Sequence, residues 1–153
     1  MARLLVDGDL ARQADQVQFE LEGWIATAPF EDLIGITIEE AGAGRAILSL
    51  PFVVKLAQGG GYLHGGALTS LADTAVAMAI KSLLPPGTIF ATTEMTTQFL
   101  LPVTAGRVRA RATVQGPEGR TFHGEAELED AAGKIVARFR STFRVARGQG
   151  FGK

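Results

Sequence analysis

The sequence lacks cysteine altogether and has only two histidines, His64 and His123, among its 153 residues. A disulfide framework, a thiolate nucleophile and a cysteine-ligated metal are therefore excluded, and a histidine-rich metal site is not expected. The formal net charge is −1, so neither nucleic acid nor an anionic membrane surface is an expected partner. No apolar run is long enough to span a membrane, and the first residues do not resemble a signal peptide. We therefore expect a cytoplasmic protein without a metal or organic cofactor.

The composition is that of an ordinary globular domain, with 46% hydrophobic and 20% charged residues. The length suits one domain, which we expect to span residues 1–153. Apolar residues between Asp9 and Trp24 loosely follow a helical spacing, which predicts a helical extension within residues 1–30. The glycine-rich end, residues 147–153, is expected to be a flexible tail.

Alternating apolar and polar residues predict strands at residues 34–39, 44–50, 92–99, 107–115, 121–129 and 135–145. Two of these strands carry rows of arginine, and the strand between them in sequence carries glutamates, which suits antiparallel neighbours with cross-strand ion pairs. Residues 67–84 form an apolar pattern at helical spacing, and this one helix can cover the apolar face of the sheet. An antiparallel sheet wrapped around one long central helix is the α+β hotdog architecture.

An acidic residue, Asp73, lies in the middle of this apolar helix. A buried carboxylate is costly unless it is paired or retained for a purpose. Two interpretations stay open from the pattern alone. Asp73 is either a structural carboxylate held by a backbone amide or an arginine, or a functional acid whose pKa is tuned by burial.

A glycine-rich loop leads into the helix and ends in His64-Gly65-Gly66. Free backbone N–H groups and the positive end of the helix dipole meet there, which suits an oxyanion or a polarised carbonyl. The alternative is a plain glycine turn that starts the helix. Gly65 precedes Asp73 by eight residues, about 12 Å of helical rise. One carbonyl group cannot reach both, so joint action of the two predicts a dimer with sites shared between subunits.

The run QGGGYLHGGALTSLADTA at residues 58–75, followed by the strand TTEMTTQF, resembles the PaaI-like hotdog thioesterases. These are related to the 4-hydroxybenzoyl-CoA thioesterases that carry their acid on the central helix. The resemblance covers roughly residues 33–145, and the aspartate in place of glutamate matches the PaaI side. It implies hydrolysis of an acyl-CoA thioester, with CoA as part of the substrate, by homodimers that pair into homotetramers.

The resemblance also implies catalytic roles. The Gly65 amide would polarise the thioester carbonyl, and Asp73 of the partner subunit would act as nucleophile or general base. Gln58 would orient water or substrate, with a solvated loop amide as the alternative. His64 would fix the loop or form a hydrogen bond near the thioester sulfur. A helper hydroxyl would come from Thr92 or, one position later, Thr93, unless these are simply strand residues.

Substrate-binding positions implied by the resemblance are Gly66, Thr93, Arg120, Thr121 and Phe122. Arg120 would contact a CoA phosphate, although a surface arginine without that role is the simpler interpretation. His123 alternates with charged residues, so we expect it on the exposed face of its strand.

Two other functions are compatible with the same fold. A hotdog module can bind acyl-CoA without cleaving it, and this would leave Asp73 without a purpose. A hotdog hydratase or dehydratase would need His64 and Asp73 to act together on one acyl chain. Release of free CoA is expected only for the hydrolase.

Overall fold

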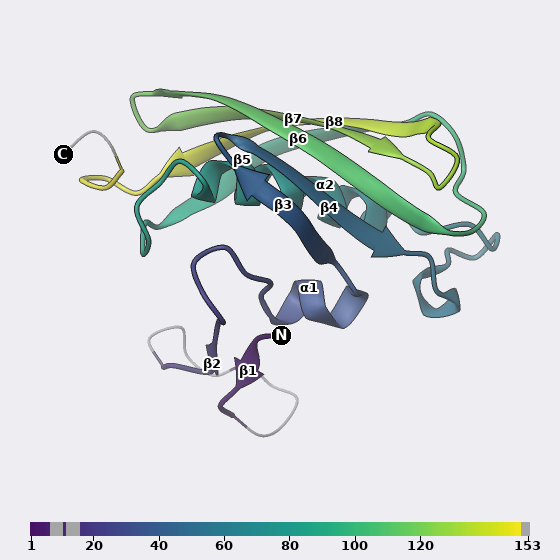
Figure 1. The fold of residues 1–153 in the computed structure, drawn as a ribbon, viewed down its shortest axis with the longest axis horizontal. Helices are drawn as coiled ribbons and strands as arrows, with labels where there is room; N and C mark the ends of the chain where they lie inside the picture. The colour runs from purple at the N-terminus through teal and green to yellow at the C-terminus, as the bar shows by residue number, and fades with distance from the viewer. Residues whose placement is uncertain (7–10, 12–15, 151–153) are drawn as a thin grey trace.

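The computed structural model describes residues 1–6, 11 and 16–150. A six-stranded antiparallel sheet curves around the helix α2 (Gly65–Lys81), with the strand order β3-β4-β6-β7-β8-β5 (Figure 1). The strands are β3 (Thr37–Gly42), β4 (Arg45–Pro51), β5 (Phe90–Phe99), β6 (Arg107–Glu118), β7 (Thr121–Glu129) and β8 (Ile135–Val145). The predicted α+β hotdog fold is therefore confirmed, and β5, the strand after α2, lies at one edge of the sheet.

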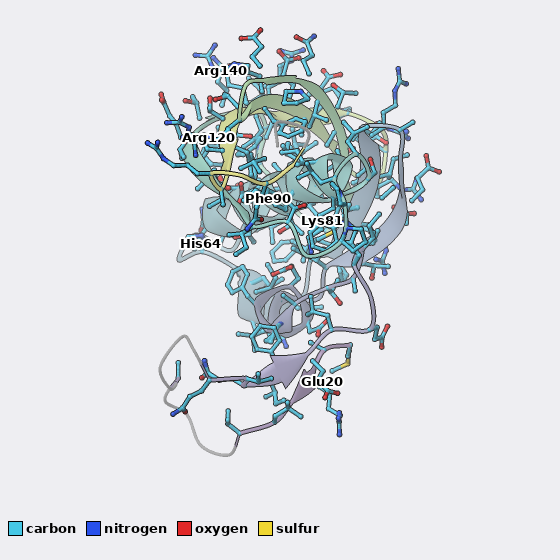
Figure 2. The ribbon with its side chains drawn as sticks, turned by 90° about the vertical axis from the view of Figure 1, so that its left-hand side faces the viewer. Glu20, His64, Lys81, Phe90, Arg120 and Arg140 are labelled. Atoms are coloured by element: carbon cyan, nitrogen blue, oxygen red, sulfur yellow. The ribbon has the colours of Figure 1, made fainter. Side chains whose placement is uncertain are left out.

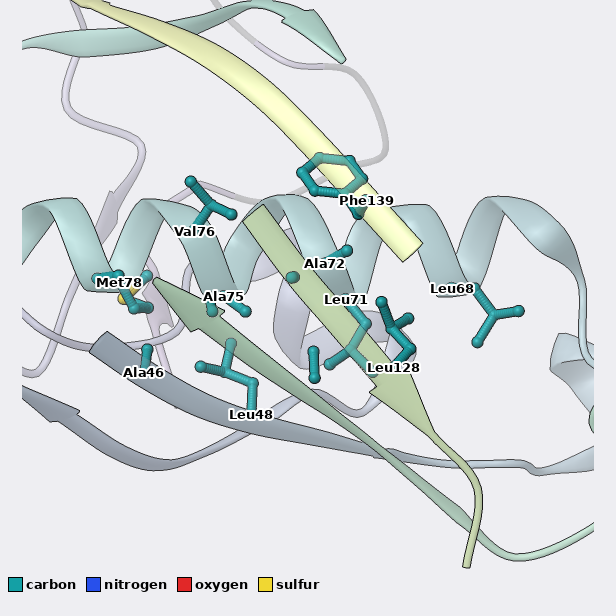
Figure 3. Packing of buried hydrophobic residues seen from close by; sticks show 14 of the residues in the cluster. Ala46, Leu48, Leu68, Leu71, Ala72, Ala75, Val76, Met78, Leu128 and Phe139 are labelled. Atoms are coloured by element: carbon teal, nitrogen blue, oxygen red, sulfur yellow. The ribbon is translucent and has the colours of Figure 1, made fainter. Parts of the chain in front are cut away.

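The core lies between the inner face of the sheet and α2 (Figure 3). Along β6, Val108, Ala110 and Ala112 are at most 2% exposed, whereas the arginines between them face outward. Glycine at position 124 lets the helix approach closely, because a Cβ there would lie 2.2 Å from Cγ1 of Val76. The alternation read from the sequence therefore gives the correct inner and outer faces.

The outer face of the sheet carries the charges, as Arg140 shows in Figure 2. Arg111 and Arg138 form ion pairs with Glu129 and Glu127 of β7 at 3.2 and 3.5 Å. These are the cross-strand pairs predicted from the rows of arginine and glutamate. They are exposed to solvent, so they contribute little to stability individually.

The N-terminal region contains a two-stranded sheet, formed by β1 (Arg3–Leu4) and β2 (Phe19–Glu20), and the short helix α1 (Pro29–Ile34). The predicted helix is wrong for residues 16–24, which include β2, while residues 7–10 and 12–15 lie outside the described residues. Apolar residues 17, 19 and 21 recur every second position, which is the period of a strand and not of a helix.

Trp24 attaches this region to the end of α2. Its indole N–H donates to the Lys81 carbonyl at 2.9 Å, and the Lys81 ammonium donates to the Trp24 carbonyl at 3.0 Å. The same ammonium lies 4.6 Å from the centre of the Trp24 ring. At the other end of the chain, the Gln149 side chain accepts a hydrogen bond from the Ile89 N–H at 2.7 Å. The expected flexible tail is therefore anchored at residue 149, and residues 151–153 lie outside the described part.

Candidate active site

The start of α2 leaves one backbone donor unused. His64 is the N-cap, and its Nδ1 accepts a hydrogen bond from the Gly66 N–H at 2.8 Å. The N–H groups of Ala67 and Leu68 bond to the His64 carbonyl. Within the described part of the chain, the Gly65 N–H has no hydrogen-bond partner. A free donor at the positive end of a 17-residue helix is suited to a carbonyl oxygen that gains negative charge.

Asp73 is half-buried in the same helix, two turns further on. Its Oδ1 accepts a hydrogen bond from the Thr92 hydroxyl of β5 at 2.7 Å. Burial raises the pKa of Asp73 above its ordinary value, and the negative charge of Glu31 adds to this, while the Thr92 hydrogen bond opposes it. Asp73 forms no ion pair with an arginine or lysine among the described residues. A half-buried carboxylate with a raised pKa and no cation is suited to proton transfer or nucleophilic attack.

A seam between α2 and the edge strand β5 links these two groups. Residues of α2 spaced four apart contact side chains of β5 that point inward. The pairs are Gly65 with Phe99, Thr69 with Thr97, and Asp73 with Thr92. The middle pair joins two hydroxyl oxygens 2.9 Å apart. The polar side of α2 therefore faces the β5 edge of the sheet, and both candidate groups lie along that edge.

A hollow of about 290 Å³ lies beside the Gly65 end of the seam. Its walls include Gln58, Tyr62 and Gly65 from the loop and helix start, together with Phe99 and residues 100–103. The side-chain Oε1 of Gln58 accepts a hydrogen bond from the Gly60 N–H, so the loop folds back on this side chain. Among the described residues, the side-chain NH₂ of Gln58 has no hydrogen-bond partner, so it remains a donor for a ligand or water.

A family model of the Thioesterase superfamily matches residues 60–137, more than half of the chain, and these residues include the helix start, Asp73 and the whole of β5. The chain belongs to this superfamily. The predicted class of enzyme, a hydrolase of thioesters, is therefore confirmed. Among the described residues, no three His, Cys, Asp or Glu side chains come together to hold a metal ion. No helix in the same part of the chain is long and apolar enough to cross a membrane.

Solved structures and curated relatives agree with this assignment. A conserved protein of Pseudomonas aeruginosa is 31% identical with a TM-score of 0.75, over 78% of this chain and 95% of that one. The PaaI protein of Escherichia coli, from the phenylacetic acid degradation operon, is 29% identical with a TM-score of 0.72, over 80% and 87%. The 1,4-dihydroxy-2-naphthoyl-CoA hydrolase of Listeria monocytogenes is 29% identical over 117 residues, 76% of this chain and 95% of that protein. The predicted resemblance to PaaI-like proteins is confirmed.

In this thioesterase, the structure distinguishes the two candidate threonines. Thr92 points inward to Asp73, whereas Thr93 is exposed and donates to the Thr142 carbonyl at 3.2 Å. A register shift between Thr92 and Glu94 separates them. Thr92 is therefore the hydroxyl at the site. Thr93 lies away from it, which does not favour the predicted substrate contact.

The other predicted substrate-binding residues are dispersed. The Gly66 N–H is used by His64. Arg120 and Thr121 are half-buried near the start of β5, and Arg120 donates to the Val145 carbonyl at 3.1 Å. Phe122 is 0% exposed in the core, so its side chain cannot contact CoA and that prediction needs correction. Alternation along β7 from Thr121 explains this, because every second residue must face α2.

His123 is exposed on the outer face of β7, as predicted. Two features of the site were missed by sequence reasoning, namely the hydroxyl pair Thr69–Thr97 and the contact of Phe99 with Gly65. The signal for the first was available, because residues 65, 69 and 73 share one helix face. The contact of Phe99 depends on how β5 folds back along α2, which no local pattern in the sequence specifies.

Proposed function

We propose that the chain hydrolyses acyl-CoA thioesters, with Asp73 as nucleophile or general base and the Gly65 N–H polarising the carbonyl. The observation that carries this proposal is the seam, on which a half-buried carboxylate with a raised pKa and a free helix-start donor face the same edge. The name of the Listeria monocytogenes relative, a hydrolase of an aryl-CoA, supports CoA thioesters as the substrate class.

In the general-base form, Asp73 takes a proton from water while the water oxygen bonds to the thioester carbonyl carbon. The carbonyl oxygen gains negative charge, which the Gly65 N–H stabilises by donating a hydrogen bond. The C–S bond then breaks, the acid is released, and the CoA thiolate leaves and is protonated. In the nucleophilic form, a carboxylate oxygen of Asp73 attacks instead, and water hydrolyses the resulting anhydride.

The proposal includes a composite site at a dimer interface. Eight residues separate Gly65 from Asp73, about 12 Å along a helix. The outer edge of β5 has no strand partner in the described chain, and Met95 in its middle is 48% exposed. An antiparallel pairing of β5 with its copy that sets Thr92 opposite Phe99 of the partner subunit would bring that subunit's Gly65 toward Asp73. Pairing of two such dimers into a homotetramer is part of the same proposal.

Release of free thiol from a panel of aryl- and fatty-acyl-CoAs tests the reaction, with Asp73→Asn run alongside the parent. We expect hydrolysis by the parent and its loss in the variant, which keeps the size of the side chain and its hydrogen bond from Thr92. Unchanged turnover in Asp73→Asn would reject the role of Asp73. Tight acyl-CoA binding without thiol release would instead favour the binding module, and consumption of an enoyl-CoA without thiol release would favour the hydratase.

Subunit mixing tests the composite site. Gly65→Pro removes the N–H at the first helical position, where proline is tolerated, and His64 before it is already extended at φ −60° and ψ 133°. Gly65→Ala is the matched control, because it adds a Cβ but keeps the N–H. Mixed dimers of Gly65→Pro and Asp73→Asn subunits contain one intact site of two. After random reassortment, the mixture should recover about a quarter of the parent activity. An inactive mixture, with exchange verified, would place both groups in one subunit.

A further inference from the structure

The ring of Phe99 lies beside Gly65, the residue whose N–H the proposed mechanism uses. A Cβ built on Gly65 would lie 3.1 Å from both Cε1 and Cζ of Phe99, so the edge of the ring rests against Gly65. Ordinary carbon contacts are about 3.5–4.0 Å apart. A methyl group at position 65 would therefore require the ring to move by a few tenths of an ångström.

The ring is placed there by the strand and is open on its other side. Phe99 ends β5 and points inward, on the same face as Thr97. It is 56% exposed and forms a wall of the 290 Å³ hollow, together with Tyr62 and Leu100. No charged residue lines this hollow. An apolar wall beside a backbone donor, with space in front of it, is suited to an uncharged group attached to the carbonyl.

We propose that Phe99 is a specificity-determining residue, whose ring limits the bulk on the carbon next to the thioester carbonyl. This inference rests on the proposed function. A carbonyl oxygen that accepts from the Gly65 N–H lies about 2.9 Å from that nitrogen. The carbon next to the carbonyl then lies close to a ring whose edge is 3.1 Å from the Cβ position of the same residue. A straight acyl chain passes the ring, and a branch at that carbon collides with it.

Matched isomers provide the test. The pairs are butyryl-CoA with isobutyryl-CoA, and 3-phenylpropionyl-CoA with 2-phenylpropionyl-CoA. We expect the parent to prefer the unbranched isomer, and Phe99→Ala to reduce that ratio of kcat/KM by about tenfold or more, the usual effect of one methyl group in a tight pocket. Phe99→Leu should shift the ratio in the same direction by less. Phe19→Ala removes the same atoms from a 40% exposed ring on β2 and should leave the ratio unchanged.

A double-mutant comparison tests the contact itself. Gly65→Ala keeps the N–H but adds a methyl group that crowds the ring, so it should increase the preference for unbranched isomers. In combination with Phe99→Ala the added methyl group has room, so the two effects should not be additive. Additive effects, or equal loss of kcat/KM for both isomers in Phe99→Ala and Phe99→Leu, would overturn the inference while leaving hydrolysis established. Absence of hydrolysis in the parent would remove the proposed function first, and this inference with it.

Discussion

The two long sides of α2 differ in what they contact. Toward the sheet, Leu71, Ala75 and Val76 are 0% exposed and pack on apolar residues of the inner face. Toward β5, the helix presents Asp73 and a threonine, both half-buried and both hydrogen-bonded to threonine hydroxyls. The first side holds the helix in place, and the second keeps ionisable and polar groups at an edge that the described chain leaves open. The 3.6-residue periodicity of one helix thus separates the apolar side that packs in the core from the polar side that carries the proposed site.

The largest expected effect comes from a substitution at Asp73, on the polar side of α2. Asp73→Asn should lower kcat by about 10²–10⁴-fold, because it removes the base or nucleophile. It should also raise Tm by a few degrees at neutral pH. The pKa of Asp73 is raised by burial in the folded state, so the charged form is disfavoured there relative to the unfolded chain.

The difference in stability between the parent and Asp73→Asn should depend on pH. Well below the unfolded-state pKa of about 3.9 the carboxyl is protonated in both states and the parent should match the variant. As pH rises through the pKa of Asp73 in the unfolded state and then in the folded state, the parent loses stability relative to Asp73→Asn. Above the folded-state pKa the difference in stability stays constant. Thermal unfolding of both proteins from acidic to neutral pH measures this. A parent that is more stable than the variant at neutral pH contradicts the argument.

On the apolar side, Gly124→Ala should produce the largest loss of stability. The new Cβ would lie 2.2 Å from Cγ1 of Val76, so the helix must move away from the sheet. We expect the free energy of unfolding to fall by about 3 kcal/mol, the upper part of the range for overpacking. Urea denaturation measures it, with Gly42→Ala as the control, because nothing lies within 4 Å of a Cβ at that position.

Val76→Ala tests the same contact between α2 and β7 from the helix side. Combined with Gly124→Ala it makes room for the added methyl group, so the double variant should be more stable than the sum of the two single losses predicts. Simple additivity would show that the contact between α2 and β7 does not limit this position.

The sequence was sufficient to predict the features that depend on one element alone. The alternation along β6 predicts which residues are buried, and the apolar pattern predicts α2 to within a few residues of Gly65–Lys81. Asp73 could be singled out because a charge inside an apolar helix is unusual. The N-terminal helix was wrong because residues 17, 19 and 21 have strand spacing within a window judged at helical spacing.

The features that the sequence could not predict depend on how two elements meet. The choice between Thr92 and Thr93 depends on the register shift in β5, and the contact of Phe99 with Gly65 depends on where β5 runs relative to α2. The substrate contact predicted for Phe122 was wrong for a different reason, because the alternation along β7 already turns this side chain toward α2 and into the core. The local sequence pattern was therefore enough to single out Asp73, whereas the residues around it are determined by the tertiary structure.

Thr92→Val should act on the polar side with an intermediate effect. The Thr92 hydrogen bond favours the ionised form of Asp73, so its removal should raise the pKa of Asp73 further. In the proposed mechanism Asp73 reacts in its ionised form, so the acid limb of the pH profile of kcat/KM should move to higher pH. At a fixed pH near that limb, kcat/KM should fall about tenfold. Thr92→Ser keeps the hydroxyl and should retain the parent profile, and an unshifted limb in Thr92→Val would exclude this role.

The smallest expected effect is at His64, the N-cap of α2. Because Nδ1 accepts from the Gly66 N–H, His64→Ala should cost about 1 kcal/mol of stability, as other N-cap losses do. His64→Asn offers an oxygen in place of Nδ1 and should restore most of that loss in urea denaturation. Its activity then separates the two predicted roles. If His64 only fixes the helix start, and with it the Gly65 N–H, His64→Asn should keep near-parent kcat. If the ring bonds near the thioester sulfur, both variants should lose kcat equally although only one loses stability, and the helix cap would then be a secondary use of a catalytic side chain.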